Sequence, residues 1–180
     1  MSELIAAGNG KKLFTAENGY LEVKITDPDI LKFELEKALF MGNHPGVFPR
    51  IKNLSDNGYL IERVNTDRVM KMNPILCQIS MSEDDNANEF FDLILEYLDG
   101  NDEPTSDEFL DELENGGSFV DIEAVKMARN NPEFIRFVDA ILVLVPRFLQ
   151  LNAPRPQQDY LDLCARQFGW RGDRLLIFDW

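Results

Sequence analysis

Two Asn-Gly dipeptides limit what the first third of the chain can form. Asn18-Gly19 separates residues 13–15 from residues 20–25, and Asn57-Gly58 separates residues 48–54 from residues 59–64. A type I′ turn needs positive φ at both central residues, and Asn and Gly adopt that conformation most readily. Each dipeptide therefore predicts an antiparallel hairpin.

A single helix is predicted between the two hairpins. Thr26 or Asp27 can cap its first turn, Pro28 suits the first helical position, and Gly42 can end it. Residues 1–66 then have the order strand, strand, helix, strand, strand. This order predicts a small, mostly antiparallel sheet with one helix, and so an α+β fold.

The rest of the chain, residues 67–180, has helical patterns and a strongly acidic middle. Half of the 32 acidic residues lie within 82–125, and that stretch holds no Lys or Arg. Residues 89–98 are spaced as an amphipathic helix, whereas 101–117 predict a long connection or a poorly packed helix. A short helix is predicted over 121–130. Residues 132–151 are the most apolar and predict a central helix.

Charge and apolar run lengths exclude several classes of function. A net charge of −14 disfavours direct binding to nucleic acid or to an anionic membrane, and it favours a basic partner surface. The longest apolar run, 140–146, is far shorter than the roughly 20 residues of a spanning helix. The first residues lack a basic region followed by an apolar one, so no signal peptide is predicted. We expect a soluble, cytoplasmic protein.

The last twenty residues carry the most informative motif. Asp162 is followed five residues on by Gln167, then by an Arg-Gly-Asp turn at 171–173, an apolar strand, and Asp179. This layout resembles the D-L-H-x-x-N…R-G-D-x-L-V-I-x-D-P pattern of short, phage-encoded protein-kinase-like proteins. The chain departs from it at Cys164, where the pattern has His, and at Gln167, where it has Asn.

The resemblance implies a two-lobed fold and a phosphotransfer site. Residues 1–66 would be a sheet lobe, and 67–180 a helical lobe with an acidic insertion at 82–125 and the terminal hairpin. Asp162 would orient the acceptor hydroxyl and take its proton, while Asp179 and Gln167 would hold Mg²⁺. If the protein is phage-encoded, it would act in the host cytoplasm.

The resemblance also implies residues that bind ATP. Gly8 and Gly10 would form the glycine-rich loop whose backbone approaches phosphates, although Leu13 stands where a third glycine is usual. Lys24, which points opposite to its strand neighbours, would hold the phosphates. Glu62 lies on the strand whose backbone would contact adenine.

The pairing partner of Lys24 stays open between Glu34 and Glu36. The proposed ATP-binding residues also have ordinary structural explanations. Gly8 and Gly10 can form a simple turn, Lys24 can be a solvated lysine, and Glu62 can lie on an ordinary sheet strand.

Three functions remain open. The chain is either an active kinase-like enzyme for host proteins, or a pseudokinase that binds a host protein. The third possibility is an acidic, non-enzymatic inhibitor of a host nucleic-acid-binding or defence protein, imitating the phosphate charge of DNA. With one His in the chain, clustered-His metal sites are excluded.

Overall fold

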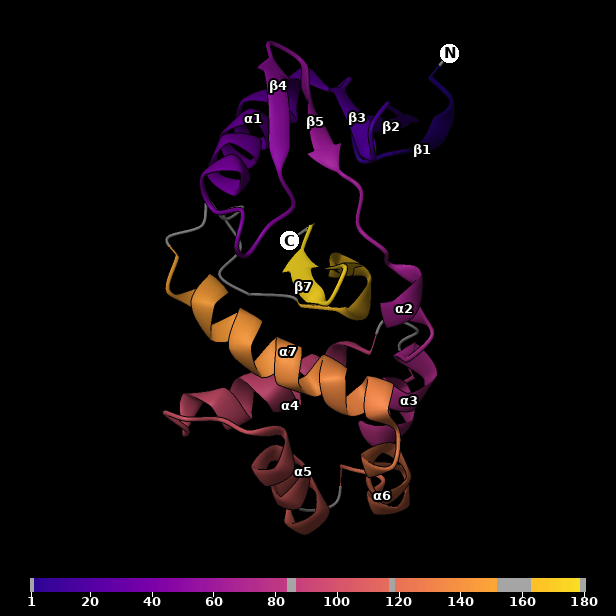
Figure 1. Cartoon of the computed structure of the whole chain (residues 1–180), viewed down its shortest axis with the longest axis vertical. Helices are drawn as coiled ribbons and strands as arrows, with labels where there is room; N and C mark the ends of the chain where they lie inside the picture. The colour runs from indigo at the N-terminus through magenta and orange to yellow at the C-terminus, as the bar shows by residue number, and fades with distance from the viewer. Residues whose placement is uncertain (1, 84–86, 117–118, 152–162, 179–180) are drawn as a thin grey trace. The chain divides into compact units, whose positions relative to one another are not determined.

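The computed structural model describes residues 2–83, 87–116, 119–151 and 163–178. It is a mixed α+β structure with a small antiparallel sheet, a separate two-stranded hairpin and a set of helices, as Figure 1 shows. The chain divides into two compact units. The first takes in residues up to Val64, and the second begins at Asn65 and includes the C-terminal hairpin.

The first unit is built on a five-stranded sheet whose neighbouring strands are all antiparallel. The strands follow in the order β1 (Leu4–Gly8), β2 (Lys11–Thr15), β3 (Tyr20–Ile25), β5 (Gly58–Glu62) and β4 (Ile51–Ser55). Helix α1 (Pro28–Asn43) packs against β3 and β4. The predicted small sheet with one helix is confirmed, but strand β1 was not predicted.

The Asn-Gly dipeptides have different roles. Asn18 and Gly19 have φ of 58° and 76°, as the predicted turn requires, and Asn9 and Gly10 form an equivalent turn with φ of 47° and 71°. Gly58, in contrast, lies inside β5 and not in a positive-φ turn. A Cβ on Gly58 would lie 2.3 Å from the carbonyl oxygen of Val23. The prediction that Gly58 adopts positive φ in a turn is therefore wrong. A glycine is needed there because the backbone of β3 approaches too closely for a Cβ.

The two faces of the sheet differ because strand side chains alternate. Val23 and Ile25 are buried, each 7% exposed, on what we term the helix face, which α1 covers. Lys24 lies between them and is exposed on the other side, the open face. Asp27 caps α1 as predicted, with its carboxylate accepting a hydrogen bond from the Asp29 amide at 2.9 Å.

The second unit is mostly helical. Its helices are α2 (Asp67–Met70), α3 (Asn73–Ile79), α4 (Asn88–Asp99), α5 (Ser106–Asn115), α6 (Ile122–Arg129) and α7 (Pro132–Leu149). Helix α7, drawn in orange in Figure 1, packs against α4, α5, α6 and the C-terminal hairpin, so the prediction of a central helix is confirmed. Within the described ranges, no helix is long and apolar enough to cross a membrane.

The acidic middle of the chain is better packed than its composition indicates. Helix α5 buries Phe109 and Leu110 completely, and Thr105 caps it by accepting a hydrogen bond from the Glu108 amide. Both predicted alternatives for 101–117 are therefore wrong over the helix. Its charges occupy the exposed face and leave an apolar face for the core.

A cluster of phenylalanines forms the core of the second unit. Phe91 of α4 stacks on Phe168 with ring centroids 5.1 Å apart, and it meets Phe137 of α7 edge to face at 6.4 Å. Phe90 makes edge contacts with Phe109 and Phe134. Aromatic pairs in these geometries add to the stabilisation from burial alone.

Candidate functional site

The C-terminal hairpin has the predicted form. Strands β6 (Phe168–Arg171) and β7 (Arg174–Ile177) pair across a turn in which Gly172 has a φ of +61°, and a short 3₁₀ turn, η1 (Ala165–Gln167), precedes them. Asp162 and Asp179, the two carboxylates on which the resemblance depends, lie outside the described residues. Their predicted roles remain predictions.

Gln167 is bound to its own backbone turn. The side-chain oxygen of Gln167 accepts a hydrogen bond from the Cys164 backbone amide at 3.0 Å. The backbone amide of Gln167 donates to the Cys164 carbonyl at 3.0 Å. Across the part of the chain that the structure describes, no group of three or more His, Cys, Asp or Glu side chains could hold a metal ion. In this geometry the Gln167 oxygen closes the turn.

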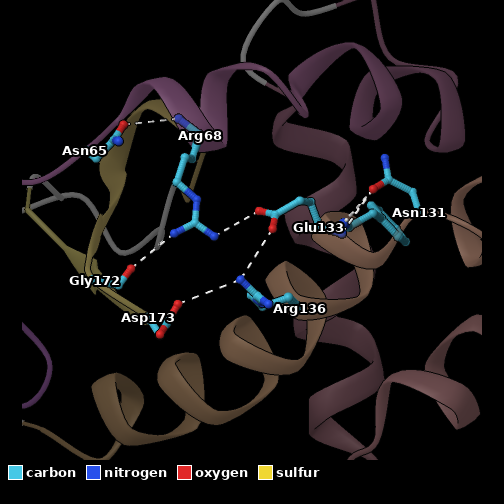
Figure 2. Close-up of polar contacts among 8 residues, drawn as sticks. Asn65, Arg68, Asn131, Glu133, Arg136, Gly172 and Asp173 are labelled. Carbon is cyan, nitrogen blue, oxygen red and sulfur yellow. Dashed lines mark hydrogen bonds and ion pairs between the residues drawn. The ribbon is translucent and has the colours of Figure 1, made fainter.

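The hairpin is fixed to the helices by what we term the Arg68 clasp, formed by Arg68, Glu133, Trp170 and Gly172. The Arg68 guanidinium donates to the Gly172 carbonyl at 3.1 Å and to the Glu133 carboxylate at 2.9 Å, as Figure 2 shows. It also lies 4.5 Å from the centroid of the Trp170 ring. The clasp therefore joins α2, α7 and the hairpin turn through one planar cation.

Two pairs of further contacts reinforce the clasp. Arg136 bridges Glu133 and Asp173 at 3.4 and 3.7 Å. Asn65 and Trp170 exchange backbone hydrogen bonds of 2.8 and 2.9 Å. Sequence reasoning missed this network, because its members lie up to about a hundred residues apart and carry no local spacing signal.

The clasp predicts acid sensitivity. The Arg68 hydrogen bond, together with the charges of Arg68 and Arg136, lowers the pKa of Glu133 from its ordinary 4.5. A lowered carboxyl pKa stabilises the folded state above pH 4.5, and that stabilisation is lost as the pH falls through the lowered pKa. Urea unfolding measured at a series of pH values below 4.5 should show that the parent chain loses stability as the pH falls. The Glu133→Gln variant should lose less stability over the same pH values. Equal acid slopes in the two proteins would contradict the prediction.

The sequence-predicted lysine lies on the open face of the sheet. The Lys24 ammonium lies 3.4 Å from the Glu22 carboxylate and 5.0 Å from the centroid of the Phe14 ring. An open depression beside it is lined by Asn53, Asn57 and Leu60, among others. Lys24 is thus held by its own strand and the neighbouring strand, not by α1.

Helix α1 pairs with a different lysine. Lys11 of β2 lies opposite Ile25 on the helix face, and its ammonium is 3.1 Å from Glu34, whereas Glu36 pairs with Lys32 at 3.9 Å. The predicted pairing of Lys24 with Glu34 or Glu36 is therefore wrong, because Lys24 and α1 lie on opposite sides of the sheet. The alternation that placed Lys24 opposite to Val23 was the signal that could have shown this.

The predicted glycine loop is a tight turn attached to α1. The Gly10 carbonyl accepts hydrogen bonds from the Thr26 and Asp27 amides at 2.7 and 3.2 Å, and a Cβ on Gly10 would lie 2.5 Å from that of Asp27. Gly8 has open space around it. Gly10, Lys11 and Glu34 are therefore brought together on the helix face.

Glu62, the predicted adenine-contact position, lies opposite Tyr20. Its carboxylate accepts a hydrogen bond from the Arg50 amide at 3.2 Å.

Comparisons with known proteins do not assign the chain to a family. No protein-family model matches the chain, and no curated protein matches it. Among solved structures, the chain is similar to one of a streptomycin–ATP–APH(2")-IIa ternary complex, with 11% identity and a TM-score of 0.37. The match covers 99% of this chain and 64% of the other. A likeness this distant assigns neither a fold nor an activity.

Proposed function

We propose that this chain is a phage-encoded, kinase-like protein that binds ATP with Mg²⁺ and acts on a host protein, as a pseudokinase that binds its partner. The order of elements supports the proposal, since a sheet unit containing one helix precedes a helical unit that ends in a hairpin. The observation that carries it is the Lys11–Glu34 pair beside the Gly10 turn.

The burial of Glu34 explains why this pair is suited to phosphate binding. Glu34 is 6% exposed; one carboxylate oxygen contacts Lys11, and the other is buried with no hydrogen-bond partner. A buried carboxylate without a cation is strongly destabilising, so Glu34 holds the Lys11 ammonium in place. A fixed ammonium beside a glycine turn is the kind of site that receives phosphate oxygens.

Asp179 keeps its predicted role within this proposal. It would hold Mg²⁺, which neutralises phosphate charge when it is bound, whereas the hydroxyl-orienting role of Asp162 belongs to the active-enzyme alternative. The engagement of Gln167 with the Cys164 amide supports binding over phosphoryl transfer.

The test compares two lysines on opposite faces of one sheet. Calorimetry with ATP and Mg²⁺ should show binding to the parent chain, and Lys11→Met should weaken it roughly tenfold, about 1.4 kcal/mol. Lys24→Met is the matched control and should change the affinity by less than about twofold. Asp179→Asn should weaken binding only when Mg²⁺ is present.

A double variant distinguishes the loss of the Lys11 contact to ATP from a loss of folding. Lys11→Met leaves Glu34 buried without its cation, so Lys11→Met/Glu34→Gln removes that charge while still lacking the ammonium. The double variant should be as stable as the parent chain and still bind ATP weakly. If ATP does not bind the parent chain, or if only Lys24→Met weakens binding, the proposal is overturned.

A second function is favoured by the spacing of the acidic groups. Glu89, Asp92, Glu96 and Asp99 recur every three or four residues along the exposed face of α4. Like charges at this spacing repel one another, and a cationic partner surface would relieve that repulsion. The row fits an inhibitor that occupies the basic cleft of a nucleic-acid-binding protein. Duplex DNA should then compete with the chain for that protein, and binding should weaken steeply with salt.

A further inference from the structure

One corner of the second unit exposes large apolar side chains. Phe119 is 81% exposed, Met81 62% and Ile122 39%. The Asp121 amide donates a hydrogen bond of 2.9 Å to the Ile79 carbonyl, which brings residues 119–122 beside the end of α3, where Met81 lies. We term Met81, Phe119 and Ile122 the apolar corner. Grouped apolar side chains at a surface commonly mark an interaction site.

The surroundings of the apolar corner are acidic. Glu83 and Glu123 are exposed next to it in the sequence, and residues 82–125 hold no Lys or Arg. Of the two cations of α6, Lys126 offsets Glu123 at 2.8 Å, and Arg129 lies between Glu114 and Asp111, so among the described residues Glu83 carries the uncompensated charge next to the corner. The corner therefore combines an apolar centre with a negative rim.

We propose that the apolar corner docks a basic amphipathic helix of a protein partner. Such a helix would place its apolar side chains on Phe119 and Met81, and its Lys and Arg side chains against the acidic rim. The unbranched Met81 side chain can adapt to different apolar partners. A second copy of this chain would bring two bodies of charge −14 together and is disfavoured by repulsion. The proposal does not depend on nucleotide binding.

The test uses two synthetic peptides of equal positive charge. One is a helical Leu/Lys peptide with an apolar face, and the other replaces its Leu residues with Ser. Fluorescence anisotropy should show that the parent chain binds the Leu/Lys peptide at least roughly tenfold more tightly than the Lys/Ser peptide. Added salt should weaken the binding without abolishing it.

Matched variants locate the site. Phe119→Ser and Met81→Gln should each weaken Leu/Lys binding several-fold, because both remove exposed apolar contacts without changing charge. Val143→Gln is the control, since Val143 is 54% exposed on α7 and not part of the corner. All three side chains are exposed, so thermal unfolding should be unchanged.

Three outcomes would overturn the proposal. Equal binding of the two peptides would mean that charge alone attracts them. Equal weakening by Val143→Gln would mean that the peptide has no defined site. Binding to zwitterionic lipid vesicles but to neither peptide would identify a lipid surface as the occupant.

Discussion

Replacing Phe91 by alanine should remove about 3–5 kcal/mol from the stability of the second unit, the range for deleting a buried aromatic ring. Phe91 is fully buried and contacts three other aromatic rings, Phe90, Phe137 and Phe168. Because small domains are stable by roughly 5–15 kcal/mol, the loss would leave this unit marginal or unfolded. Urea unfolding followed by far-UV circular dichroism measures it.

The position of Phe168 makes this prediction specific. The ring stacked on Phe91 belongs to the C-terminal hairpin, so the variant should also release the hairpin and expose the buried Trp170 to water. Tryptophan fluorescence should shift to the red at urea concentrations where the parent chain is unchanged. Phe119→Ala, at an 81% exposed position, is the control and should cost less than about 0.5 kcal/mol. Similar losses in both variants would contradict the packing described here.

Gly58→Ala should destabilise the sheet of the first unit by about 3 kcal/mol, the upper end of the range for overpacking. The added Cβ would lie 2.3 Å from the Val23 carbonyl oxygen, and Gly58 pairs directly with Lys24 across β3 and β5. The clash is with backbone, so it can be relieved only by moving apart two central strands. Thermal unfolding should show a lower midpoint.

Gly46→Ala provides the comparison for Gly58. No atom lies within 4 Å of a Cβ built on Gly46, and its φ is not in the left-handed region. We therefore expect its unfolding midpoint to equal that of the parent chain or to exceed it slightly, because alanine restricts the unfolded chain. A Gly58→Ala protein as stable as Gly46→Ala would show that β3 and β5 do not approach as closely as described.

The elements predicted correctly are those whose determinants are local. Asn18-Gly19 sets a turn by its own backbone preferences, and Asp27 caps α1 through a bond to a residue two positions on. Strand β1 was missed although Asn9-Gly10 carries the same turn signal, because that dipeptide was interpreted as part of a nucleotide loop. Apolar spacing was enough to predict α7 as the central helix.

The candidate site could be predicted less well, because its contacts join distant residues. Nothing near Arg68 in the sequence indicates that it binds Glu133 and the Gly172 carbonyl. Lys24, and not Lys11, was predicted to hold the phosphates because it matches the position of the phosphate-binding lysine in kinase-like proteins. Strand alternation alone shows that a lysine flanked by buried Val23 and Ile25 points away from whatever helix covers them.

The stacking of Phe91 on Phe168 has a consequence for folding during synthesis on the ribosome. The sheet and α1 of the first unit are complete once residue 62 has left the ribosome, so this part can fold during synthesis. The helical core lacks the ring that stacks on Phe91 until the 77 residues that follow Phe91, as far as Phe168, have been added, a delay on the order of ten seconds at typical synthesis rates. During that interval the apolar faces of the helices lack part of their packing, so the nascent chain should expose apolar surface that the finished protein buries.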